Sequence, residues 1–140
     1  MSISKIAWLY LLTIPVFFAI DMIWLGLIAK GFYRKTLAAF LSDKVNWPAA
    51  IIFYLLFIIG ILLFAVLPAL SKNALWYALL YGGMFGFFTY ATYDLTNLAT
   101  MKNWPMAVVF VDIIWGAILS AAVATISYFI GRWIDLGSSG

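Results

Sequence analysis

The sequence has no cysteine, no histidine and no glutamate, and only 9% of its 140 residues are charged. The missing cysteines and histidines exclude disulfide bonds, thiol catalysis, the usual zinc sites and histidine-ligated haem, so we expect no metal and no cofactor. A soluble domain carries roughly 25% charged residues. The charges here are too few to cover a water-facing surface, and the composition therefore indicates a membrane protein.

Hydrophobic residues make up 67% of the chain, and its mean hydropathy is +1.11. They gather in four stretches, each near or above the roughly 20 residues that a helix needs to cross the hydrocarbon core of a bilayer. We predict an all-α fold, an integral membrane four-helix bundle of two helical hairpins, with the lipid bilayer as its partner. Residues 1–136 would form this single domain, and residues 137–140 resemble an appended linker. The expected spans are residues 6–29, 49–70, 74–98 and 106–133.

Two of the expected spans carry small residues at helical spacing. Gly82 and Gly86 lie four residues apart in the third span, as do Gly116 and Ser120 in the fourth. Small residues at this spacing let helix backbones approach closely in a membrane, so we expect both faces to pack against other helices. The second span is almost wholly apolar, and we expect it to be the most lipid-exposed because it has no polar group to hide.

A short motif, Asn-Trp-Pro, precedes the second span and the fourth. In each copy asparagine can cap a helix, tryptophan can lie at the level of the lipid headgroups, and proline can occupy the first helical turn. The longer connection, residues 31–48, alternates apolar and basic side chains. This pattern fits either a short amphipathic helix in the membrane interface or a plain basic loop. The interface motif residues are Asn46, Trp47, Pro48, Asn103, Trp104 and Pro105.

Three aspartates interrupt the apolar spans. Asp21, Asp94 and Asp112 belong to three different spans, and at 1.5 Å per helical residue each lies roughly 10–14 Å inside the same membrane face. Ionisable groups are costly in hydrocarbon, so a chain that keeps three at one depth is expected to use them. We therefore predict a shared polar pocket. The other residues expected there are Trp24, Tyr90, Tyr93, Asn97 and Trp115.

One run of the sequence carries a family resemblance. Residues 93–100 read YDLTNLAT, Lys102 is followed by Asn-Trp-Pro, and Asp112 begins the run DIIWG; the pair Asp21 and Trp24 fits the same pattern. Over nearly its whole length the chain resembles a family of small bacterial inner-membrane proteins, the domain-of-unknown-function family 2177. The resemblance implies a four-helix membrane protein and brings no assigned activity.

The predicted pocket leaves three classes of function open, and it identifies no catalytic residue. A carboxyl group held among apolar helices can relay protons, bind a cation or act as a general acid or base. The first class is a small transporter-like or proton- or cation-handling protein, working as a homo-oligomer because four helices seldom enclose a pathway alone. The second is a membrane enzyme using aspartate chemistry on a lipid or isoprenoid, and the third is a structural or regulatory subunit. The ligand would be a lipid-like or other small molecule.

The distribution of basic residues predicts an orientation. Five lie on the side of the Asn-Trp-Pro motifs and three on the other, so we expect these loops in the cytoplasm and both termini outside the inner membrane. Because the basic residues lie in the connections rather than on one continuous face, we expect no nucleic-acid partner. The first group is Lys30, Arg34, Lys35, Lys44 and Lys102, and the second is Lys5, Lys72 and Arg132.

Overall fold

The computed structural model describes residues 1–138, and within them every regular element is helical. The prediction of an all-α protein is confirmed. Residues 139 and 140 of the expected linker lie outside the described part of the chain. The elements in chain order are α1 (Ile3–Ile23), the π-helical turn η1 (Trp24–Ile28), α2 (Lys30–Thr36), α3 (Trp47–Ile61), the π-helical turn η2 (Leu62–Val66), α4 (Leu67–Lys72), α5 (Leu75–Thr100) and α6 (Met106–Ser138).

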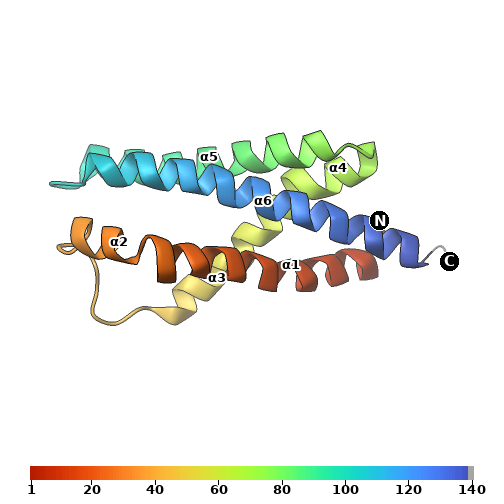
Figure 1. Ribbon diagram of the computed structural model, residues 1–140, viewed down its shortest axis with the longest axis horizontal. Helices are drawn as coiled ribbons and strands as arrows, with labels where there is room; N and C mark the ends of the chain where they lie inside the picture. The colour runs from red at the N-terminus through yellow and green to blue at the C-terminus, as the bar shows by residue number, and fades with distance from the viewer. Residues whose placement is uncertain (139–140) are drawn as a thin grey trace.

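The chain passes along the molecule in alternating directions (Figure 1). The α1–η1 segment makes the first pass and α3–η2–α4 the second, while α5 and α6 make the third and fourth. The α1–α3 and α5–α6 connections lie at one end and both termini at the other. Three stretches in the described residues are long and apolar enough to cross a membrane: Ile3–Ile28, Trp47–Lys72 and Met106–Gly137.

Helix α5 has 26 residues but is less apolar than the other three passes. It carries Asp94, Asn97 and a row of threonines. The threonines bond their hydroxyls to backbone carbonyls three or four residues earlier in the same helix, as Thr92 does to Phe88 at 2.6 Å and Thr100 to Thr96 at 2.8 Å. These polar donors are therefore satisfied within α5 and need no water.

Asparagines mark the helix ends in the connections. Asn46 caps α3 by accepting a hydrogen bond from the amide of Ala49 at 3.2 Å, and Pro48 occupies the first turn. Asn73, with φ of 52°, ends α4 in the left-handed conformation, and Asn103, with φ of 60°, turns the chain between α5 and α6. Asparagine tolerates this backbone better than most residues. The helix ends therefore follow from local sequence.

The most extensive contact between two helices joins α5 and α6. A Cβ added to Gly86 would lie 2.0 Å from the carbonyl oxygen of Gly116, and one added to Gly82 would lie 2.6 Å from the Cβ of Ala124. Any side chain at these positions would force the backbones apart. The hydroxyl of Ser120 is buried in the same contact. The small residues thus set the spacing of the α5–α6 pair.

The second pass, α3–η2–α4, is not the most exposed helix, and that prediction was wrong. In its most apolar stretch 33% of the residues are buried, against 17% in Ile3–Ile28. α3 crosses the bundle obliquely (Figure 1), and its buried residues Phe57, Ile58 and Ile61 join the main core. An absence of polar groups did not predict lipid exposure because the protein core is equally apolar.

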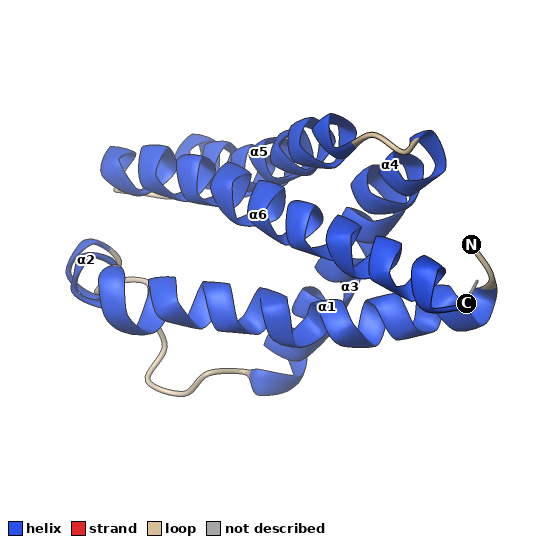
Figure 2. Cartoon of the chain, turned by 45° about the vertical axis from the view of Figure 1, so that its right-hand side comes forward, coloured by secondary structure: helices blue, strands red, loops and turns tan. Residues whose placement is uncertain are grey.

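The first expected hairpin is loose. α1 packs more extensively against α6 than against α3, and the hydroxyls of Thr13 and Ser127 lie 2.8 Å apart in that α1–α6 contact. Figure 2 shows the two helices meeting near the termini and diverging towards α2. This divergence leaves room for the large side chains of the candidate site.

Candidate functional site

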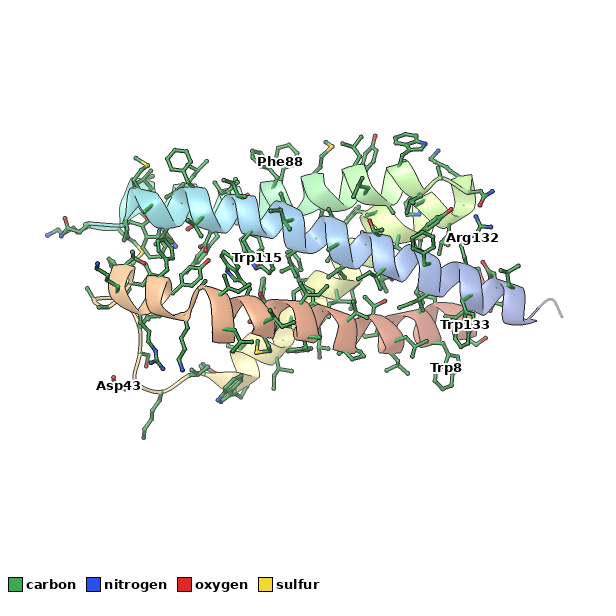
Figure 3. The ribbon with its side chains drawn as sticks, in the orientation of Figure 1. Trp8, Asp43, Phe88, Trp115, Arg132 and Trp133 are labelled. Atoms are coloured by element: carbon green, nitrogen blue, oxygen red, sulfur yellow. The ribbon has the colours of Figure 1, made fainter. Side chains whose placement is uncertain are left out.

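Aromatic side chains occupy the space where α1 and α6 diverge. Trp24 of η1 stacks on Trp115 of α6, with ring centroids 4.5 Å apart and planes 10° from parallel. Trp115 points from α6 towards α1 (Figure 3). The π-helical turn begins at Trp24, whose carbonyl accepts from the amide of Ala29 at 2.7 Å. Such turns are frequent at functional sites because they alter side-chain register within a helix.

Asp21 is buried on α1, one turn before Trp24. The indole Nε1 of Trp115 donates to its Oδ1 at 3.3 Å. The hydroxyl of Tyr54, from α3, interacts with the same carboxyl group. Asp21 is therefore held by a donor from α6 and lies beside a tyrosine of α3, at a junction between α1, α3 and α6.

Asp112 of α6 is held by Tyr33 of α2. The Tyr33 hydroxyl donates to Asp112 and accepts from the Nε1 of Trp24 at 3.3 Å. Tyr33 lies outside the three apolar stretches, and burial raises its pKa above the ordinary value of 10.0, with the Asp112 carboxyl raising that pKa further. Tyr33 therefore keeps its proton and remains a donor to Asp112.

Asp94 of α5 is fully buried, yet neither of its carboxyl oxygens has a hydrogen-bond partner among the described residues. It interacts directly with Asp112. The indole N–H of Trp104 lies nearby and also lacks a bonded partner. A buried polar group without a partner is costly. The polar groups beside Asp94 are therefore the Asp112 carboxyl group and the Trp104 indole.

Tyr90 connects the acids across the bundle. Its ring packs on Gly116, where an added Cβ would lie 2.3 Å from it, and it interacts electrostatically with Asp21 and Asp112. Tyr93 is 57% exposed on the outer side of α5 and interacts with Asn97. Asp94 and Asp112 are thus neighbours, and aromatic side chains lie between them and Asp21, whereas Asn97 contacts the group only through Tyr93.

A cavity of about 370 Å³ lies beside Asp112, between α3, α5 and α6. Phe57 forms its buried side, while Phe53 and Tyr93, which are 51% and 57% exposed, form its outer edge. This edge belongs to the flanks of α3 and α5, so the cavity opens on the side of the bundle. Asp112 alone of the three acids lines it. The lining residues are Phe53, Phe57, Thr89, Tyr90, Tyr93 and Asp112.

The connection after α1 covers the end of α6. α2 has seven residues, and the apolar side chains Phe32, Leu37 and Phe40 of this connection pack with Trp104 and Val108 in a second core cluster. The structure therefore combines the two alternatives of the sequence: a short helix, then turns and a loop. The apolar side chains of this connection face the protein.

The two Asn-Trp-Pro motifs are not equivalent. Trp47 is 59% exposed, whereas Trp104 is 7% exposed behind Phe40 and Tyr93, with ring centroids 5.2 and 6.0 Å away. Trp104 therefore packs within the protein, and its expected position at the level of the lipid headgroups stays a prediction. The motif alone could not reveal this, because the connection that covers Trp104 comes from a distant part of the chain.

Sequence reasoning missed two tyrosines of the cluster. Tyr54 is the only hydroxyl-bearing residue in α3, and that isolation was the available signal. Tyr33 lies in the basic connection, where nothing local distinguishes it from an interfacial aromatic residue. Both become visible only when α2 and α3 are placed against α6.

The cluster presents one acid, Asp112, to the cavity. No group of three or more histidine, cysteine or acidic side chains is arranged to hold a metal ion in the described residues. Asp94 and Asp112 place two carboxyl groups side by side among apolar helices. From the cavity, a ligand would meet aromatic rings and the Asp112 carboxyl group.

Comparison with known proteins gave one match. The model of a family described as "Predicted membrane protein (DUF2177)" matches residues 6–129. No curated protein and no solved structure matches the chain. The family match covers all three acids and nearly all of the helical region.

Proposed function

This chain belongs to the DUF2177 family of predicted membrane proteins, and we propose that it handles protons or small cations at the Asp94–Asp112 pair as a transporter-like membrane protein. The observation that carries the proposal is the state of Asp94, which is buried beside the Asp112 carboxyl group and makes no regular hydrogen bond among the described residues. Two such groups in a low dielectric hold one proton between them more readily than two charges. A cation arriving at Asp112 would release that proton.

The proposed arrangement in the membrane is a four-helix bundle in which α5 is the fourth span. α5 packs along α6, which is itself one of the apolar stretches, and has a comparable length. Its threonine hydroxyls are bonded within the helix, as hydrocarbon requires. Its one acid, Asp94, is buried inside the protein.

A pathway through a single copy is not evident, which favours a homo-oligomer. Towards the termini the core is filled by fully buried side chains such as Leu9, Phe17 and Val123. The cavity at Asp112 opens sideways instead. A second copy beside α3 and α5 would complete the wall of a pathway.

The proposed location is the bacterial inner membrane, with the Asn-Trp-Pro loops in the cytoplasm and the termini outside. The excess of basic residues at the α2 end supports this orientation. The Asp94–Asp112 pair would then lie near the cytoplasmic face.

Proton movement into proteoliposomes tests the proposal. The protein is reconstituted with a pH-sensitive dye inside, and a potassium gradient with valinomycin supplies the driving force. The natural chain should carry protons, and Asp94→Asn and Asp112→Asn should each lower the rate at least about tenfold, since either change removes the shared proton. Asp43→Asn, in the exposed loop (Figure 3), is the matched control.

The variants must be shown to be folded by their helical circular dichroism and elution volume. Equal rates in the natural chain, the controls and empty vesicles would reject the proposal. If proton transport is lost only in variants that also unfold, the acids have a structural role.

The side opening supports a second candidate, a membrane enzyme acting on a lipid or isoprenoid. A lipid could reach Asp112 from the bilayer, past Phe53 and Tyr93, without entering water. Asp112 would then act as a general acid or base. Organic extraction of the purified protein tests this: a lipid enriched in the natural chain but absent from Asp112→Asn supports the enzyme, and no enrichment opposes it.

A further inference from the structure

We infer that the cavity beside Asp112 binds an organic ammonium group, such as an alkylated amine, rather than an inorganic ion. The inference rests on the proposed function and names the cation that reaches the pair. It comes from the residues that surround the cavity, and four of the six are aromatic.

Three rings form a continuous wall. The ring centroids of Phe53 and Phe57 are 5.6 Å apart, and those of Phe57 and Tyr90 are 6.0 Å apart. Tyr93 lines the cavity from the neighbouring turn of α5. The faces of aromatic rings attract cations within about 6 Å, and quaternary ammonium groups are bound in proteins by cages of this kind.

Asp112 supplies the only ionisable carboxyl group among the lining residues. Its hydrogen bond from Tyr33 requires it to act as an acceptor, and this bond fixes its orientation. Thr89 contributes no free donor, because its hydroxyl is bonded to the carbonyls of Phe85 and Gly86 at 2.8 and 3.1 Å. A positive group in the cavity would therefore meet one acid and several rings.

Other ligand classes fit this lining less well. A hard metal ion prefers six or more oxygen ligands, which the cavity does not offer. An acyl chain would suit the rings but would leave the Asp112 carboxyl group without a counter-charge. An ammonium group uses both features, and a volume of about 370 Å³ lies within the range of small-molecule sites.

Binding of choline tests the inference against a neutral molecule of the same shape, 3,3-dimethylbutan-1-ol. Affinities are measured by saturation-transfer NMR on the protein in a maltoside detergent, which carries no ammonium group. The natural chain should bind choline at least about tenfold more tightly than the alcohol, because only choline gains from the acid and the ring faces.

Two variants and two controls complete the experiment. Asp112→Asn should abolish the preference for choline, and Phe53→Leu should weaken choline binding by about threefold or more while preserving affinity for the alcohol. Asp43→Asn and Phe129→Leu, both at exposed positions away from the cavity, should preserve the preference.

Equal affinity for choline and the alcohol, or a preference unchanged in both cavity variants, would overturn the inference. Proton movement in vesicles made from the same preparations separates this failure from failure of the proposed function. If transport depends on Asp112 but choline is not preferred, only the nature of the cation has been misassigned.

Discussion

Tyr33, in the connection between the first two passes, donates a hydrogen bond to Asp112, 79 residues later in the chain. Trp24 extends this contact by donating to the Tyr33 hydroxyl. A group outside the apolar stretches thus engages an acid within one of them. The connection is therefore part of the site and not only a link between helices.

Tyr33→Phe should loosen this connection while leaving the helices in place. The variant loses a hydrogen bond to a carboxyl group, which is worth about 1–3 kcal/mol, but keeps its ring. Hydrogen–deuterium exchange of residues 31–40 should increase. Tyr81→Phe, at a partly exposed position on α5, is the control and should exchange as the natural chain does. Unchanged exchange in Tyr33→Phe would show that the hydrogen bond does not hold the connection.

The raised pKa of Tyr33 predicts a loss of stability in alkali. Below the ordinary pKa of 10.0, the phenol is neutral in both the folded and unfolded chains and has no effect. Above that value the unfolded chain loses the proton while the folded chain retains it, so the free energy of unfolding falls as pH rises. Thermal unfolding in detergent should therefore shift less between pH about 9 and about 11 in Tyr33→Phe than in the natural chain. Equal shifts would contradict the raised pKa.

Gly86→Ala should disrupt the α5–α6 pair. The new methyl group would meet the Gly116 carbonyl oxygen at 2.0 Å, and the overpacking should cost about 3 kcal/mol or more, because backbone cannot rotate away. Gly83→Ala is a matched control on the same helix, since its Cβ would lie 3.6 Å from Ala121, an ordinary contact. Denaturant titrations followed by circular dichroism compare the two. Similar stabilities would reject the close contact.

Asp21 is predicted to act through its acceptor oxygen. Asp21→Asn keeps a carbonyl oxygen for the Trp115 indole and should be tolerated. Asp21→Leu is similar in size but leaves the half-buried indole N–H of Trp115 without its acceptor, at a cost of about 1–3 kcal/mol. Thermal unfolding of the two variants measures the difference. If the leucine variant is as stable as the asparagine variant, the acceptor oxygen of Asp21 does not stabilise the cluster.

The helical passes could be predicted from sequence because each depends on local properties. Length and apolar content gave the stretch Met106–Gly137 to within a few residues, and the first Asn-Trp-Pro motif marked Asn46 as a helix boundary. Spacing along a helix also indicated where Gly82 and Gly86 would permit close packing. None of these features requires knowledge of a neighbouring helix.

Other features depended on how the passes meet. The burial of Trp104 follows from the α1–α3 connection folding over it, and the oblique crossing of α3 buries residues whose pattern shows no preferred face. Tyr33 and Tyr54 joined the cluster for the same reason. The grouping of the three acids was inferred from their similar depth in the membrane. Depth alone could not predict that, of the three, only Asp112 lines the cavity.

Infrared spectroscopy of the carboxyl groups tests most directly the central claim that Asp94 and Asp112 form one proton-sharing pair. The natural chain in lipid at neutral pH should show the C=O stretch of a protonated carboxylic acid. Asp94→Asn and Asp112→Asn should each shift or remove that band, whereas Asp43→Asn should not. If no protonated band is present, or if each substitution leaves the other acid's band unchanged, the two groups titrate independently and the account is contradicted.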